Sequence, residues 1–106
     1  MTGSDDGAVG GEVFEVTLSG EVDVARSSEL EGVALAFGIS SCPSIRVDLA
    51  AVTFIDSSGL GMLAQLRNIA LNRGGHAVLV DPAPSCLKTF RLVGFDQAFT
   101  IERTTH

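Results

Sequence analysis

The sequence is poor in several residue types on which common functions depend. It has no tryptophan or tyrosine, one lysine, two cysteines, two histidines and three prolines among 106 residues. Thirteen acidic residues outnumber seven basic ones, which gives a formal charge of −6. Because nucleic-acid binding requires clustered lysine and arginine to neutralise phosphates, we expect no nucleic-acid partner.

The few cysteines and histidines are also badly spaced for a metal site. Cys42 and Cys86 form no CxxC pair, and the histidines are His76 and the terminal His106. No zinc-site spacing is present, and we expect no metal or cofactor. Cys42 precedes one expected strand and Cys86 follows another, which puts them at opposite sheet edges and argues against an internal disulfide. Free thiols are typical of a reducing compartment.

Long hydrophobic runs are missing as well. No window approaches the roughly eighteen apolar residues of a membrane span. The N-terminus has neither the basic nor the apolar region of a signal peptide. The sequence therefore predicts a cytoplasmic protein without a membrane partner. Its length and its 45% apolar content are typical of one folded domain.

Hydrophobic periodicity divides the chain into alternating strands and helices. Residues 1–11 contain four glycines and two aspartates and are expected to form a mobile tail. Strands are predicted over 12–18, 45–55 with a bend, 76–80 and 99–101. Helices are predicted over about 25–38, 60–71 and 82–94. This order predicts an α/β domain with a mostly parallel or mixed sheet of four to five strands and three to four helices.

The most informative stretch is DSSGLG, between an apolar strand and an amphipathic helix. Asp56, Ser57 and Ser58 are all capping residues, although one is enough to cap a helix. Gly59 and Gly61 weaken the first turns of the helix, which indicates that something approaches the backbone closely. A helix N-terminus also tolerates a phosphate. Judged on spacing alone, plain capping and a phosphorylation site both stay open.

Loops that follow parallel strands share one sheet edge, where ligands bind. These loops are predicted at 20–23, 56–58 and 81–85. Four acidic residues are expected at this edge: Glu21, Asp23, Asp56 and Asp81. A phosphate adds a charge of about −1.5 to −2. Phosphorylation at this edge would therefore alter binding by charge repulsion without refolding the domain.

The DSSGLG turn after a hydrophobic strand, together with the upstream sequence LSGEVD at 18–23, resembles the STAS domain of bacterial anti-sigma factor antagonists. The resemblance covers about residues 12–101, including Gly74-Gly75 and the LVGF corner at 92–95. It implies a monomeric, non-enzymatic STAS domain over 12–106. Family members usually begin with an extra short strand, for which residues 2–9 are a poor candidate.

The resemblance also implies a mechanism. The first serine of the turn, here Ser57, would be phosphorylated by an anti-sigma factor that is also a serine kinase. The unphosphorylated form would bind that factor and release a sigma factor, and a serine phosphatase would restore it. No GxxxxGK[ST] loop or HRD-like base is present, which favours a phosphate acceptor over a kinase.

Roles follow for the neighbours of Ser57. Asp56 is expected to orient the hydroxyl or nearby amides, Ser58 to cap the helix, and Asp23 to shape the adjacent surface. Plain capping stays open for both aspartates. The predicted kinase- and partner-binding residues are Glu21, Asp23, Asp56, Ser58 and Gly59.

Three alternatives remain. Residues 59–64 fit the pattern GxGxxG/A, with Asp81 downstream, as in a dinucleotide-binding site. In such a site the glycines form the tight turn, but here Asp56, Ser57 and Ser58 already form it. The chain is also too short for both halves of a dinucleotide-binding fold. In a receiver domain, Asp56 would accept the phosphate, and this chemistry requires a lysine at the end of another strand. The single lysine, Lys88, lies in a predicted helix. The third alternative is a STAS subunit of a transporter or signalling scaffold, which would never be phosphorylated on Ser57. A co-purified partner would distinguish this subunit from a phosphorylated antagonist.

Overall fold

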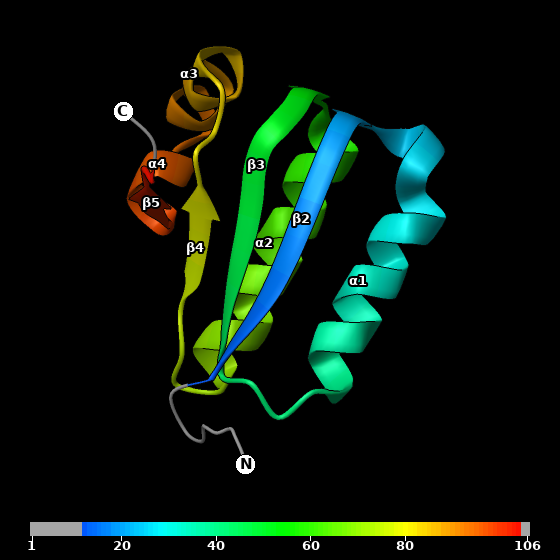
Figure 1. Cartoon of the computed structure of the whole chain (residues 1–106), viewed down its shortest axis with the longest axis vertical. Coiled ribbons are helices and arrows are strands. Elements are labelled where there is room, and N and C mark those ends of the chain that lie inside the picture. Colours follow the sequence, from blue (N-terminus) through cyan, green and yellow to red (C-terminus); the bar gives the residue numbers. More distant parts are fainter. Residues whose placement is uncertain (1–11, 105–106) are drawn as a thin grey trace.

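The computed structural model describes residues 12–104 (Figure 1). The strands are β2 (Val13–Val22), β3 (Ser44–Ile55), β4 (Ala77–Val80) and β5 (Thr100–Glu102). The helices are the 3-10 turn η2 (Val24–Arg26), α1 (Ser27–Ile39), α2 (Ser57–Asn72), α3 (Pro84–Val93) and α4 (Phe95–Ala98). The tail predicted over 1–11 and the question of an N-terminal strand lie outside the described residues.

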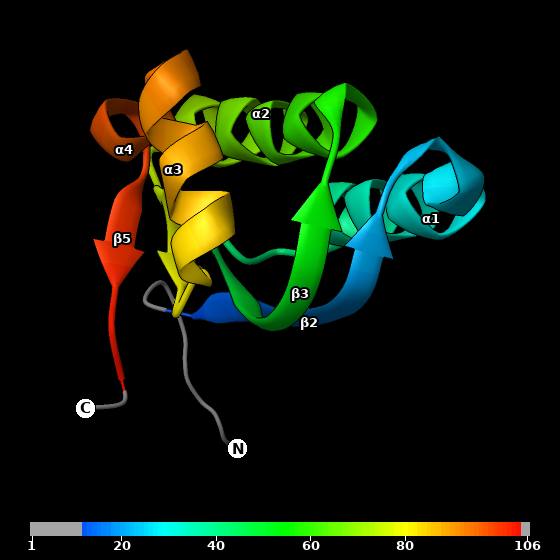
Figure 2. The same ribbon diagram turned by 90° about the horizontal axis from the view of Figure 1, so that it is seen from above.

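The four described strands form one parallel sheet in the order β2-β3-β4-β5, which confirms the predicted α/β class. β3 pairs with β2 from Ser44 opposite Val13 to Ile55 opposite Val22. β4 pairs only with the first part of β3, and its last residue, Val80, lies opposite Asp48. The later halves of β2 and β3 therefore run on beyond β4 and curve strongly (Figure 2).

The prediction that Ser19-Gly20 ends the first strand is wrong. β2 continues to Val22 through two shifts in register with β3. Gly20 takes a φ of 70°, which glycine adopts without strain. The Arg26 guanidinium donates to the carbonyls of Ser19 and Glu21, which secures this irregular stretch. The predicted loop at 20–23 is therefore mostly strand.

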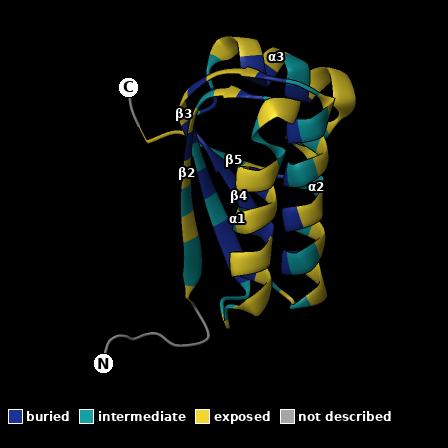
Figure 3. Cartoon of the chain, turned by 90° about the vertical axis from the view of Figure 1, so that its right-hand side faces the viewer, coloured by how far each residue is buried: buried dark blue, intermediate teal, exposed yellow. Residues whose placement is uncertain are grey.

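The core lies between the sheet and helices α1 and α2, which lie side by side on one face (Figure 3). Along the start of β3, every second residue is buried against them: Ile45, Val47 and Leu49. The helices contribute the predicted apolar stripes, with Leu30, Ala34 and Phe37 buried on α1 and Leu63, Leu66 and Ala70 buried on α2. This packing fixes the start of α2 against the ends of β2 and β3.

The other end of the chain adds a small aromatic cluster to the same core. Phe90 of α3 stacks on Phe95, and Phe95 contacts Phe99, with ring centroids 5.9 and 4.9 Å apart. Cys86 is a buried residue of α3, and burial raises the pKa of its thiol. Cys42 is half-buried, and both thiols are free. Within residues 12–104, no helix combines the length and apolar character needed to cross a membrane.

Candidate functional site

The candidate site is the turn between β3 and α2. Val22 and Ile55, the last residues of β2 and β3, are paired. Asp23 and Asp56 therefore begin two adjacent turns, and the Asp56 N–H donates to the Val22 carbonyl at 3.2 Å. The structure thus brings Asp23, Asp56 and Ser57 to one edge, as the sequence predicted.

Asp56 is the N-cap of α2. One carboxylate oxygen, Oδ1, accepts from the N–H groups of Ser58 at 2.9 Å and Gly59 at 3.2 Å. The prediction that Ser58 caps the helix is therefore wrong. Helix α2 begins at Ser57, so Asp56 holds the extended conformation that a cap requires. Asp56 does contact the neighbouring amides, one of its two predicted roles.

Ser57 is the first residue of α2, and it is exposed, whereas Ser58 is half-buried. The partial positive charge at a helix N-terminus favours an anionic group at this position. An incoming enzyme therefore has access to the Ser57 side chain, and a phosphate can be accommodated there in solvent. The arrangement suits modification of Ser57 more than modification of Ser58.

Gly59 is required by close packing within the chain. A Cβ at this position would lie 2.6 Å from Ile55 Cγ1 and 2.9 Å from the Val22 carbonyl oxygen. The close approach predicted for this glycine is therefore made by the ends of the chain's own strands β3 and β2. Gly61 differs, because a Cβ there would meet nothing within 4 Å.

The neighbouring turn is held by Asp23 and Arg26. Asp23 Oδ1 accepts from the Ala25 N–H at 3.1 Å, so Asp23 caps η2. Arg26 forms an ion pair with Glu29 at 2.9 Å. Their hydrogen bond raises the pKa of Arg26 and lowers that of Glu29. Glu21 is exposed on β2, and only its main-chain carbonyl engages Arg26.

Asp81 does not lie beside Ser57, contrary to the sequence prediction. It follows Val80, which pairs with Asp48, whereas β3 continues to Ile55. Asp81 instead accepts from the N–H of Thr104 at 2.8 Å and also from its hydroxyl. The three acidic residues gathered at the candidate site are therefore Glu21, Asp23 and Asp56.

Two apolar residues of this edge were missed by the sequence analysis. Val24, directly after Asp23, is 68% exposed, and Phe54, just before the end of β3, is 50% exposed. Alternation along the strand offered a signal for Phe54, since its neighbour Ile55 is buried. Aromatic side chains such as Phe54 are enriched at protein interfaces, so this edge offers apolar contact to a partner.

The model of the family described as STAS domain matches residues 8–106. The chain belongs to the STAS domain family. Anti-sigma-B factor antagonists of Staphylococcus epidermidis are 37% identical over 51 residues, which is 48% of this chain and 47% of theirs. The matched stretch thus spans about half the length of these curated relatives.

Several solved structures have a similar fold over most of their length. An anti-sigma factor antagonist from Mycobacterium paratuberculosis is 30% identical, with a TM-score of 0.76 over 92% of this chain and 80% of that one. SpoIIAA in its unphosphorylated form is 22% identical, with a TM-score of 0.77 over 94% of this chain and 86% of that one. Phosphorylated SpoIIAA, from Bacillus, also matches, with a TM-score of 0.70.

Proposed function

We propose that this STAS domain is a cytoplasmic, monomeric anti-sigma factor antagonist whose binding is controlled by phosphorylation on Ser57. The observation that carries the proposal is the exposed Ser57 at the first position of α2, one residue after the capping carboxylate of Asp56. The names of its relatives from Staphylococcus epidermidis and Mycobacterium paratuberculosis support the antagonist role. The two SpoIIAA structures support an STAS fold that is compatible with both phosphorylation states.

The partner is an anti-sigma factor with serine kinase activity. In the transfer step, Ser57 Oγ attacks the γ-phosphorus of ATP, its proton passes to a base of the kinase, and ADP leaves. A serine phosphatase hydrolyses the phosphoserine and returns the free hydroxyl. The STAS domain itself is the substrate in both steps and catalyses neither.

The phosphate weakens binding by its charge. In the unphosphorylated form, the exposed Val24 and Phe54 supply apolar contact beside the turn. At an effective dielectric of about 20, two unit charges about 6 Å apart repel by roughly 3 kcal/mol before salt screening. Since about 1.4 kcal/mol corresponds to tenfold in affinity, the dianion on Ser57 is enough to release the partner when it faces a carboxylate of the partner at this distance or loses its hydration in the contact.

The test mixes the protein with a purified serine-kinase anti-sigma factor from the same organism and ATP, and maps the modified peptide by mass spectrometry. We expect one phosphate, on Ser57. Ser58→Ala is the matched control, because it removes the adjacent hydroxyl and should leave modification intact. In a binding assay, Ser57→Ala should equal the wild type and Ser57→Asp should bind at least about tenfold more weakly, from charge repulsion.

An unmodified protein, with equal partner binding by Ser57→Ala and Ser57→Asp, would contradict the proposal. The chain would then fit a constant subunit of a transporter or signalling scaffold. Isolation of the native protein within a membrane-transport or scaffold complex, with Ser57 unmodified, would establish that second function.

A further inference from the structure

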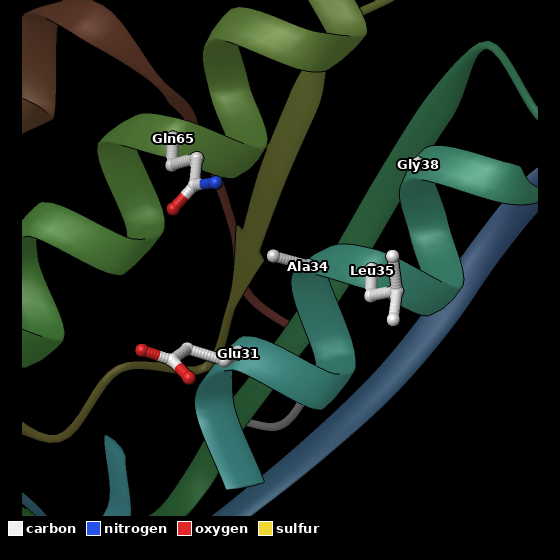
Figure 4. A pocket seen from close by; sticks show the side chains of 5 residues that line it. All are labelled: Glu31, Ala34, Leu35, Gly38 and Gln65. Carbon is white, nitrogen blue, oxygen red and sulfur yellow. The ribbon is translucent and has the colours of Figure 1, made fainter. Parts of the chain in front are cut away.

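A groove runs between α1 and α2 and ends at the first turn of α2. One hollow of about 320 Å³ lies over Ala34, Leu35 and Gly38 (Figure 4). A second, of about 250 Å³, extends to Ser58 and Gly61. Both hollows are lined by Glu31 of α1 and Gln65 of α2, so together they form one groove, which we call the α1–α2 groove.

Two glycines leave the backbone of the α1–α2 groove open. Gly38 and Gly61 both lie within helices, where glycine is less favourable than alanine. A Cβ at either position would meet nothing within 4 Å, and neither has a positive φ. Packing within the chain therefore explains Gly59 but not these two. Open helix backbone at a groove allows another chain to approach closely.

The rim of the groove is apolar and acidic. Leu35 of α1, which lines the groove, is 67% exposed, and Ile39, about one turn further along the same helix, is 80% exposed. Helix α1 contains Glu29 and Glu31 but no lysine or arginine. Glu29 is paired with Arg26, whereas Glu31 takes part in none of the ion pairs of residues 12–104. An occupant that complements this surface carries apolar side chains and at least one basic residue.

The length and charge of the groove define the occupant further. From Ser27 to Gly38, α1 rises by about 16 Å, enough for anchors at i, i+3/i+4 and i+7 of another helix. A second copy of this chain is a poor occupant, because it carries the same charge of −6. The second hollow is lined by Ser58, the residue after Ser57, so this end of the groove lies at the start of α2.

We propose that the α1–α2 groove seats an amphipathic, lysine- or arginine-bearing helix of the protein that phosphorylates Ser57, and so holds the kinase beside its acceptor. This inference rests on the proposed function and adds a docking surface to it. Glu31 pairs with a basic side chain of that helix, and Gly38 and Gly61 allow the two backbones to approach.

The test measures binding of the same purified serine-kinase anti-sigma factor to groove variants. Gly38→Leu fills the groove, and Gly32→Leu is its matched control. Both glycines lie in α1, and a Cβ at either position would meet nothing within 4 Å, but Gly32 does not line the groove. We expect Gly38→Leu and Glu31→Lys each to weaken binding by about tenfold or more, a loss of at least about 1.4 kcal/mol. Gly32→Leu should bind within about twofold of the wild type, and all three should unfold at or above the wild-type urea midpoint.

Binding of Gly38→Leu and Glu31→Lys equal to that of Gly32→Leu, with Ser57 still phosphorylated, would overturn the groove while leaving the proposed function intact. Absence of any binding or phosphorylation of the wild type would overturn both. A wild-type protein that dimerises, with Glu31→Lys altering the dimer, would assign the groove to a second copy instead. Restored binding of Glu31→Lys by a Lys→Glu or Arg→Glu change in one partner helix would locate the occupant.

Discussion

Gly59 and Gly61 lie two residues apart at the start of α2 but face different surroundings. At Gly59 a methyl group would lie within 3 Å of Ile55 Cγ1 and of the Val22 carbonyl oxygen, whereas at Gly61 it would enter open space. We expect Gly59→Ala to lower the free energy of unfolding by about 1 to 3 kcal/mol, because the strand ends must move. Urea denaturation measures this change.

Gly61→Ala is the control within the same helix. Alanine there should raise the free energy of unfolding by up to about 1 kcal/mol, because it improves helix propensity without a clash. If Gly59→Ala and Gly61→Ala changed the free energy of unfolding equally, β2 would not pack closely against the start of α2. In that event the position of Ser57 would not be fixed by packing against Val22.

Single residues of the site were only partly predictable from the sequence. The pattern DSSGLG indicated a capped turn and placed Ser57 near it, and the structure leaves Ser57 exposed. The prediction of Ser58 as the cap instead of Asp56 was wrong, because both side chains can accept from amides two or three residues ahead. The choice depends on where the helix begins, and pairing of Val22 with Ile55 sets that position. Such long-range pairing leaves no local signal.

At the scale of elements, Arg73 joins the end of α2 to the end of α1. Its guanidinium donates to the carbonyls of Phe37, Gly38 and Cys42, and lies over the Phe37 ring at 5.0 Å. We expect Arg73→Ala to lower the free energy of unfolding by about 1.5 to 3 kcal/mol, since charged hydrogen bonds to three main-chain carbonyls at and after the end of α1 are lost. Chemical denaturation provides the measurement.

Arg73→Lys separates charge from geometry. Lysine keeps the charge but cannot reach three carbonyls with a planar fork, so its effect should fall between wild type and alanine. The exposed Arg91 supplies the reference, and Arg91→Ala should change stability by no more than about 0.5 kcal/mol. A loss for Arg73→Ala as small as that of Arg91→Ala would mean that the contacts of Arg73 add nothing to stability.

Element types were predictable because hydrophobic periodicity is local. Helix ends followed from turn chemistry, as at Gly94, which takes a φ of 81° after α3. The extension of β2 beyond Gly20 was not predictable, because it depends on Arg26 binding the carbonyls of Ser19 and Glu21. The misplacement of Asp81 has the same origin: β4 is shorter than β3, and only the paired register shows it.

At the scale of the whole molecule, the proposed switch is a charge added at the surface of a packed core. Val22, Ile55 and Leu63 are buried in the single core beneath the start of α2, whereas Ser57 is exposed above them. We therefore expect the proposed phosphorylation of Ser57 to change the electrostatic potential of one edge and to leave the packing in place. A loss of binding on phosphorylation can then be measured without a loss of folding, whereas a mutation in the core would cause both.

We expect phosphorylated protein and Ser57→Asp to unfold within about 0.5 to 1 kcal/mol of the wild type, with any change towards higher stability, because negative charge is favourable at a helix N-terminus. Their weaker partner binding should recover partly as salt rises from about 0.1 to 1 M, where the Debye length falls from about 10 to 3 Å. Urea denaturation and affinity measured across this salt range test both expectations. Loss of several kcal/mol of stability on phosphorylation, or a salt-independent binding defect, would mean that the phosphate acts by disrupting the fold or by steric blockage instead.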